Sequence, residues 1–257
     1  MKASSLLANK FIRTVLVLAF WLLVWQGLSW LVGINLLLPG PIGVARSLAG
    51  LLGTANFRVA TDATAFSLLG ILLGFLFGVA GGSALAWLTW KSALMDALFS
   101  PLLRLVRTAP VASFIILALL WLTSRTVPMV IAALMVVPIL WSSTKTAIEE
   151  TDHALLEMAV AYRFSRWNTF RLVYLPSILP QWTAACATAM GLAWKSGIAA
   201  EVIAQPRPAL GTNLYRARLF LNTEEVFAWT VLVIVLSFIL ERFFVRLMAW
   251  AGRRYTV

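Results

Sequence analysis

Charged residues are scarce in this chain. They occupy 12% of its 257 positions, while hydrophobic residues occupy 61%, and the mean hydropathy of +0.89 lies outside the range of a soluble globular domain. A helix needs about 20 mainly apolar residues to cross a bilayer, so stretches without Asp, Glu, Lys or Arg predict the crossings. Six such stretches occur, at Thr14–Ala45, Ala63–Trp90, Thr108–Ser124, Thr126–Thr144, Leu172–Trp194 and Val226–Leu240. We therefore expect an all-α membrane protein with about six transmembrane helices in a single domain, residues 1–257.

Cysteine and histidine are almost missing, with Cys186 and His153 the only examples. A single cysteine excludes a disulfide framework and a cysteine metal cluster, and Cys186 is expected to serve packing. A single histidine leaves little for the metal-binding pairs or Ser/His arrangements of an intramembrane enzyme. We expect no catalytic residue, no metal site and no cofactor in this chain.

Acidic residues are fewer than basic ones, 10 against 21, which gives a net charge of +11. Such a charge can indicate nucleic-acid binding, but here the basic residues are scattered between apolar stretches instead of lining one soluble face. If the N-terminus lies in the cytoplasm, more of them fall in inner than in outer segments, as the positive-inside rule requires. We therefore expect both termini in the cytoplasm and no nucleic-acid partner. The first apolar run is too long for a signal peptide and predicts a retained helix.

Proline and glycine divide the N-terminal half. The sequence Leu38-Pro39-Gly40-Pro41 breaks helical periodicity, and residues 42–53 then predict a short amphipathic helix on the outer surface. In the second apolar stretch, glycines recur every fourth position, which stacks small residues on one helix face and predicts close packing against another helix. These glycines are at positions 70, 74, 78 and 82.

The third apolar stretch is irregular, because Arg104 and Arg107 lie one turn apart and Pro110 soon interrupts the helix. Counted from Asp96 along a straight helix, Arg107 would lie about 16 Å into a hydrocarbon core about 30 Å thick. An arginine at that depth needs a partner or water. The alternative is that both arginines sit near, or snorkel to, the cytoplasmic boundary. The sequence leaves both interpretations open.

The longest polar stretch separates the fourth and fifth apolar runs, at about residues 148–176. Thr151 or Asp152 can cap a helix that runs to about Tyr162. Ser165 can cap a second helix that ends at Leu175-Pro176. Composition alone permits either a docking hairpin or a solvated loop on the headgroups.

The order of residues in this stretch resembles the cytoplasmic signature of binding-protein-dependent ABC importer permeases. In that family Glu-Ala-Ala, Gly, Ile and Leu-Pro recur at the spacing of Glu157-Met158-Ala159, Arg163, Val173 and Leu175-Pro176. Met158 departs from the usual alanine and Arg163 from the usual turn glycine. If Arg163 must take the positive φ that glycine tolerates, it incurs strain, so the turn geometry can differ here.

The resemblance covers nearly the whole chain and is greatest to the nitrate, sulfonate, taurine and bicarbonate group. Further matching segments are Leu38 to Pro41, Arg107 to Pro110, Ala161 to Trp167, Gly191 to Trp194 with Glu201, and Leu210-Gly211. It implies a type I importer permease fold in the bacterial inner membrane, with a cytoplasmic coupling-helix hairpin between helices 4 and 5. The residues that it assigns to coupling with an ATPase are Glu157, Met158, Ala159, Arg163, Ser165, Arg166, Leu175 and Pro176.

The resemblance also implies partners: a second permease subunit, two cytoplasmic ATP-binding subunits that hold ATP and Mg, and an extracytoplasmic solute-binding protein that delivers a small solute. Whether the second permease is an identical copy stays open. The chain itself has no Gly-x-x-x-x-Gly-Lys-Ser/Thr loop for phosphates, so it is not expected to be an enzyme. A secondary transporter is the alternative, although the two similar halves typical of that class are not found.

Residues in apolar surroundings suggest the translocation path. Lys195 and Glu201 are about 240° apart on an ideal helix and so point to different neighbours. We expect Lys195 and Arg107 to make the path positive for a small anion such as a sulfonate or nitrate, with Glu201 gating the path or forming an interhelical salt bridge. A zwitterionic or cationic solute stays open. The candidate path residues are Arg107, Pro110, Trp194, Lys195 and Glu201.

Overall fold

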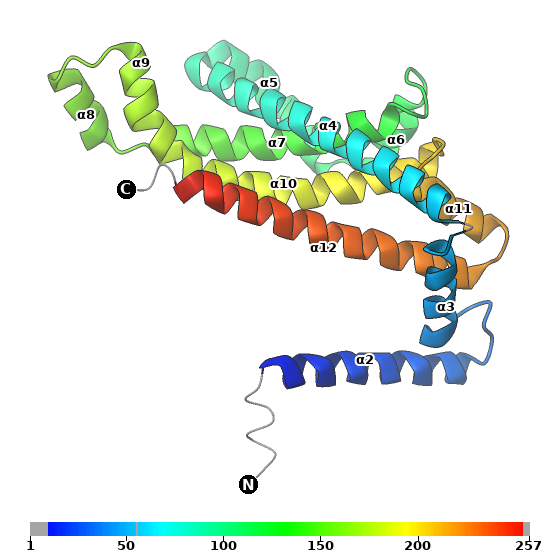
Figure 1. Ribbon diagram of the computed structural model, residues 1–257. Helices are drawn as coiled ribbons and strands as arrows, with labels where there is room; N and C mark the ends of the chain where they lie inside the picture. Colours follow the sequence, from blue (N-terminus) through cyan, green and yellow to red (C-terminus); the bar gives the residue numbers. More distant parts are fainter. Residues whose placement is uncertain (1–9, 55, 254–257) are drawn as a thin grey trace, which may run out of the picture. The chain divides into compact units, whose positions relative to one another are not determined.

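The computed structural model describes residues 10–54 and 56–253, and within them it contains helices and no strand (Figure 1). The helices are α2 (Lys10–Val32), α3 (Pro41–Leu51), α4 (Phe57–Lys91), α5 (Ala93–Thr108), α6 (Val111–Ala118), α7 (Val127–Glu149), α8 (His153–Ala161), α9 (Arg166–Thr169), the π-helix η1 (Phe170–Tyr174), α10 (Leu175–Ala204), α11 (Leu210–Leu219) and α12 (Thr223–Arg253). The all-α prediction is confirmed.

Three of the described helices are long and apolar enough to cross a membrane: Ile12–Val32 of α2, α4 and α7. The bent pair α5 and α6 makes a fourth if the two helices form one broken span. The other two predicted crossings fall in α10 and α12, whose 30 and 31 residues correspond to about 45 Å of helix. Each predicted apolar stretch thus contains a helix, although Thr108–Ser124 is helical over only about half of its length.

The chain divides into two compact units, Met1–Thr61 with Asn213–Val233 and Asp62–Thr212 with Ile234–Val257. The single-domain prediction stays a prediction. In the first unit, Pro39 and Pro41 interrupt the helix as expected, and Pro41 begins α3. The Trp25 indole donates to the Pro39 carbonyl at 3.1 Å, and Thr223 Oγ1 donates to the Leu36 carbonyl at 2.6 Å. These bonds satisfy backbone groups of the loop before α3.

In the second unit, α7 and α10 run side by side (Figure 1), and the glycine face of α4 packs on α7. A Cβ on Gly78 would lie 2.6 Å from the Val136 Cβ, and one on Gly82 would lie 2.7 Å from the Val137 carbonyl oxygen. For Gly70, by contrast, no atom of the described part of the chain lies within 4 Å of a Cβ position. The predicted packing role is therefore confirmed for the later glycines of the repeat and is wrong for Gly70.

Polar bonds connect helices of this unit near the start of α5. Ser92 caps α5 by accepting from the Met95 amide. Asp96 Oδ1 accepts from Ser100 Oγ at 2.5 Å and from the Lys145 ammonium of α7 at 2.6 Å. Because Lys145 also lies 3.9 Å from Glu149, its charge is balanced by two carboxylates. This network fixes the start of α5 against the end of α7.

We expect Gly78→Ala to lower the stability of the purified protein by about 1–3 kcal/mol, because the added methyl group must displace Val136 or the α7 backbone. Gly70→Ala is the matched control, since it makes the same change on the same helix into open space, where alanine favours the helix by up to about 1 kcal/mol. Unfolding midpoints in detergent compare the two. Equal destabilisation by both variants would contradict this packing surface.

Candidate functional site

The break between α5 and α6 positions Arg107. A residue before proline avoids the helical region, and Ala109 is accordingly extended at φ −75° and ψ 148°. As a result α5 ends at Thr108, and α6 starts after Pro110 at an angle of 107° to α5. The predicted interruption at Pro110 is confirmed. Arg107 therefore lies in the last turn of α5, where the helix dipole favours a cation.

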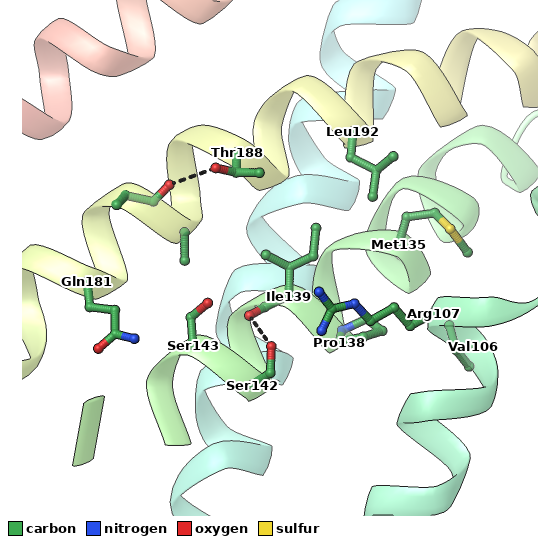
Figure 2. A pocket seen from close by; sticks show the side chains of 12 residues that line it. Val106, Arg107, Met135, Pro138, Ile139, Ser142, Ser143, Gln181, Thr188 and Leu192 are labelled. Atoms are coloured by element: carbon green, nitrogen blue, oxygen red, sulfur yellow. Dashed lines mark hydrogen bonds between the residues drawn. The ribbon is translucent and has the colours of Figure 1, made fainter. Parts of the chain in front are cut away.

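Arg107 lines a pocket of about 430 Å³ between α5, α7 and α10 (Figure 2). Figure 2 shows the guanidinium extending from α5 toward Pro138 and Ile139 of α7. The wall combines apolar and polar side chains, and its members are Val106, Arg107, Met135, Pro138, Ile139, Ser142, Ser143, Gln181, Ala184, Ala185, Thr188 and Leu192. The pocket is thus formed by three helices, one of which carries a cation.

The charge of the pocket, which comes from Arg107, suits an anion, while the hydroxyls donate to backbone carbonyls. Ser142 Oγ donates to the Ile139 carbonyl and Thr188 Oγ1 donates to the Ala184 carbonyl, both at 3.2 Å. No ion pair with Arg107 is found within the described residues, and no acidic side chain is among those that line the pocket. A cation that lacks a carboxylate partner attracts an anionic solute, and its guanidinium can bind an oxyanion through two parallel hydrogen bonds.

The other candidate path residues lie elsewhere in the same unit. Pro110 is exposed at the start of α6, Trp194 is buried, and Lys195 is exposed on α10. None of them lines the pocket around Arg107. Conversely, Ser142, Gln181 and Thr188 line it and were not expected from the sequence, because a single hydroxyl or amide in an apolar helix gives no spacing signal.

Glu201 is fully buried and holds the turn into α11. Its Oε2 accepts from the Gly211 amide at 2.9 Å, and a Cβ on Gly211 would lie 2.6 Å from the Glu201 Cβ. The adjacent Leu210 amide donates to Ser67 Oγ at 3.0 Å. The carboxylate therefore caps the first turn of α11, where the helix dipole favours negative charge. Within the described residues it forms this hydrogen bond and no salt bridge.

The polar stretch after α7 folds as a helical hairpin, with α8 and α9 beside the start of α10 (Figure 1). Both predicted caps form. Asp152 Oδ1 accepts from the Ala154 amide at 2.8 Å, and Ser165 Oγ accepts from the Asn168 amide at 3.2 Å. This stretch is therefore a helical hairpin and not a solvated loop.

Arg163 takes the conformation that the usual glycine would take, with φ at 51°. The Phe164 amide donates to the Ala159 carbonyl at 2.9 Å and the Arg163 amide donates to the Val160 carbonyl at 3.0 Å. These two bonds form the Schellman motif that ends many helices. The turn therefore keeps the geometry of a glycine turn and bears the strain of a side chain at positive φ.

The second helix of the hairpin does not end at Leu175-Pro176, contrary to the sequence prediction. It continues from α9 through η1 into α10. Pro176 has no N–H, so the carbonyl four residues earlier has no donor in an α-helix. The wider π-helical turn moves the bonding by one residue, as in the bond from the Leu175 amide to the Phe170 carbonyl. One helical path thus connects the hairpin with the pocket wall.

Glu157, Met158 and Val160 of α8 are exposed, as is Tyr162 directly after the helix, with Val160 77% and Tyr162 74% exposed. Ala159 is buried, as is Val173 of η1. The remaining signature residues Arg163, Ser165 and Arg166 are exposed, while Leu175 and Pro176 are half-buried. The hairpin therefore presents one carboxylate among apolar side chains on an open surface, a composition suited to a protein partner.

Comparison with known proteins gives consistent matches. Residues 67–255 match the family described as the binding-protein-dependent transport system inner membrane component. The taurine transport system permease protein TauC of Escherichia coli (strain K12) is 28% identical over 232 residues, which cover 87% of this chain and 82% of TauC. The putative aliphatic sulfonates transport permease protein SsuC of the same strain is 27% identical over 218 residues, 83% of this chain and 81% of SsuC.

A chain of the MetNI methionine ABC transporter, solved in inward-facing conformations, shares the fold. The two superpose with a TM-score of 0.66 at 15% sequence identity, and the match covers 80% of this chain and all of that one. At this identity the likeness concerns the fold alone. It confirms the predicted type I importer permease fold.

We expect Arg163→Gly to stabilise the hairpin by about 1 kcal/mol, because glycine adopts positive φ without the clash of a Cβ. Arg163→Ala removes the same exposed side chain but keeps the Cβ, and it serves as the matched control. Hydrogen exchange of peptides spanning residues 153–174 checks this, with about fivefold slower exchange expected for the glycine variant. Equal exchange rates in Arg163→Gly and Arg163→Ala would show that the positive φ at this position does not destabilise the hairpin.

Proposed function

The chain belongs to the family of binding-protein-dependent transport system inner membrane components, and on that premise we propose that it conducts a small organic anion of the sulfonate class along the pocket around Arg107. The chain is a multi-pass membrane permease subunit of an ABC importer. The observation that carries the choice of an anion is the Arg107 guanidinium, which faces a pocket without a carboxylate partner.

The substrate class rests on both chemistry and similarity. A sulfonate presents three oxygens that can accept from a guanidinium, and the hydroxyls of Ser142 and Thr188 lie in the same wall. The names of TauC and SsuC refer to taurine and aliphatic sulfonates. A pocket of about 430 Å³ is large enough for such a small solute.

Transport in this proposal is driven by partner subunits. The permease acts with a second permease copy, two cytoplasmic ATP-binding subunits and a solute-binding protein outside the membrane. ATP and Mg are held by the ATP-binding subunits, because the permease sequence contains no phosphate-binding loop. The N- and C-termini lie in the cytoplasm, which agrees with the excess of basic residues in the inner segments and places the hairpin on the side of the ATPase.

The hairpin provides the mechanical connection between ATPase and pocket. Glu157, Met158 and Ala159 with Arg163, Ser165 and Arg166 form the docking surface, and Leu175 and Pro176 start the helix behind it. From Leu175 to Leu192 of the pocket wall, α10 spans about 25 Å. When the ATPase closes and pulls on α8, α10 moves with it and changes access to the pocket. The chain thus contributes coupling and a path, and it performs no chemistry.

The remaining residues of the predicted path have other roles in this proposal. Lys195 is exposed on α10 and contributes positive potential to a wider part of the path. Pro110 and Trp194 maintain the helix geometry around Arg107, and Glu201 stabilises the turn at Gly211. Of the predicted set, Arg107 alone is assigned to direct contact with the solute.

We expect Glu157→Arg to abolish or strongly reduce co-purification of the ATP-binding subunit, because it reverses the one carboxylate on the exposed face of α8. The permease is tagged, expressed with its neighbouring genes and extracted in mild detergent, and its partners are identified by mass spectrometry. Glu150→Arg is the matched control, since Glu150 is exposed at the end of α7 and outside the signature. If no ATPase accompanies even the native chain after mild crosslinking, a secondary transporter becomes the better proposal.

We expect Arg107→Gln to lower the uptake of an alkanesulfonate about tenfold or more, because a charge-assisted hydrogen bond contributes about 1.5–3 kcal/mol. Arg104→Gln serves as control, since Arg104 is exposed one turn earlier and does not line the pocket. Uptake into cells and ATPase activity stimulated by the loaded binding protein are both measured. Unchanged uptake by Arg107→Gln would refute the anion path while leaving the coupling proposal intact.

A further inference from the structure

A second pocket, of about 640 Å³, opens between the end of α4 and the hairpin. We name it the tryptophan pocket. Its aromatic members come from two segments 70 residues and more apart in the sequence, and they are Trp87, Trp90, Phe164, Trp167, Phe170 and Tyr174. It shares no lining residue with the pocket around Arg107, so the translocation path does not account for it.

The rings form a connected cluster. The Trp87 ring lies edge-on to Trp90, Phe170 and Tyr174, with centroid distances of 5.5, 5.3 and 5.8 Å. On the hairpin, the Trp167 ring lies 5.8 Å from the Phe170 ring. Trp87, Trp90 and Tyr174 also pack against buried residues of α7 and α10, so one side of the cluster is fixed. Trp167 on the other side is 66% exposed.

Packing alone does not explain the polar groups of this pocket. Within the part of the chain that the structure describes, the indole N–H groups of Trp87, Trp90 and Trp167 donate to no protein acceptor. Lys91 and Arg166 line the pocket and are both exposed. None of the described lining residues is acidic. An apolar floor, free N–H donors and two cations together fit an amphipathic anion.

The place of the pocket along α4 identifies the source of that anion. Lys91 is the last residue of a helix that is long and apolar enough to cross a membrane, and the first charged one after its apolar run, so the pocket belongs to the headgroup end of that helix. Tryptophan and tyrosine concentrate at this depth, and basic pockets between helices on the cytoplasmic side bind anionic headgroups. The cytoplasmic side follows from the orientation in the proposed function, on which this step rests.

We propose that the tryptophan pocket binds the headgroup and glycerol region of an anionic phospholipid. Lys91 attracts the phosphate, and the indole N–H groups donate to its ester or headgroup oxygens, while Arg166, which belongs to the docking surface, adds positive charge at the edge of the pocket. The rings cover the apolar part of the lipid. Because Trp87 and Trp90 belong to α4 whereas Trp167 and Phe170 belong to the hairpin, a bound lipid contacts both segments and holds the hairpin against the membrane helix.

The test is photolabelling of the assembled complex in lipid nanodiscs. A trace of photoactivatable phosphatidylglycerol is compared with the corresponding phosphatidylcholine, and labelled peptides are mapped by mass spectrometry. We expect phosphatidylglycerol to label peptides containing residues 87–91 and 164–174 at least about fivefold more than phosphatidylcholine, since each basic side chain near an anionic surface changes binding by about that factor. An excess of inorganic phosphate leaves the labelling unchanged if a lipid, and not free phosphate, is recognised.

Lys91→Gln is expected to lower labelling by phosphatidylglycerol about fivefold. Arg171→Gln is the matched control, because Arg171 is exposed on the same hairpin and does not line the pocket. Equal labelling by both lipids, displacement by phosphate, or an unchanged Lys91→Gln signal would overturn the proposal. Labelling that emerges only after the ATPase is removed would assign the pocket to the ATPase instead.

The photolabelling test can fail independently of the proposed function. Labelling is measured on the permease chain, whereas the importer proposal is contradicted if no ATPase co-purifies. The two failures are therefore recognised by different signals in the same preparation.

Discussion

Inside a bilayer, hiding apolar side chains gains nothing, because the lipid is as apolar as the helix interior, and helices associate through close approach of small residues. The face of α4 that contains Gly74, Gly78 and Gly82 meets α7 so closely that a Cβ at Gly78 or Gly82 would collide with it. Gly197 of α10 approaches Ile71 in the same way, with 2.5 Å from a Cβ position to Cγ1. The rest of the second unit depends on these contacts, since they position the two helices that form most of the pocket wall.

Whereas the glycines bring helices together, the prolines remove backbone hydrogen bonds and so end or weaken helices. Pro110 separates α5 from α6 and places Arg107 at a helix end. Pro138 lines the pocket itself and removes one backbone bond from α7. In hydrocarbon such a loss is tolerated where the freed carbonyl faces protein or water. The backbone bond that Pro138 removes therefore lies beside the cavity, where polar groups can be solvated.

Features set by local chemistry could be predicted from the sequence. The caps by Asp152 and Ser165, the interruption at Pro110 and the helix after Pro41 all follow from side chains that bond or block their own backbone. These caps and interruptions involve neighbours within a few residues, so they need no tertiary information. The importer fold is expected for a different reason, the resemblance of the segment around Glu157 to the signature of a known family.

Features set by distant contacts could not be predicted. Gly70 continues the repeat of four, yet no atom of the described residues lies within 4 Å of its Cβ position, because the packed face covers only part of the helix length. The partner of Glu201 is a backbone amide, and no residue pattern identifies a backbone donor. Ser142, Gln181 and Thr188 line one pocket with Arg107 only when α7 and α10 lie side by side. Pro176 indicates a helix end in sequence, yet a single π turn lets the helix continue.

That continuation determines what the hairpin can do. A helix that ended at Pro176 would leave the docking surface on a flexible joint, and movement of α8 would be lost before it reached the membrane. The path from Arg166 through η1 to Ala204 stays helical despite Pro176 and Pro180, so displacement at the hairpin reaches the pocket wall. The Schellman turn at Arg163 extends the same rigidity to α8. The strain at this position is therefore the cost of keeping α8 at a fixed angle to the helix that it must move.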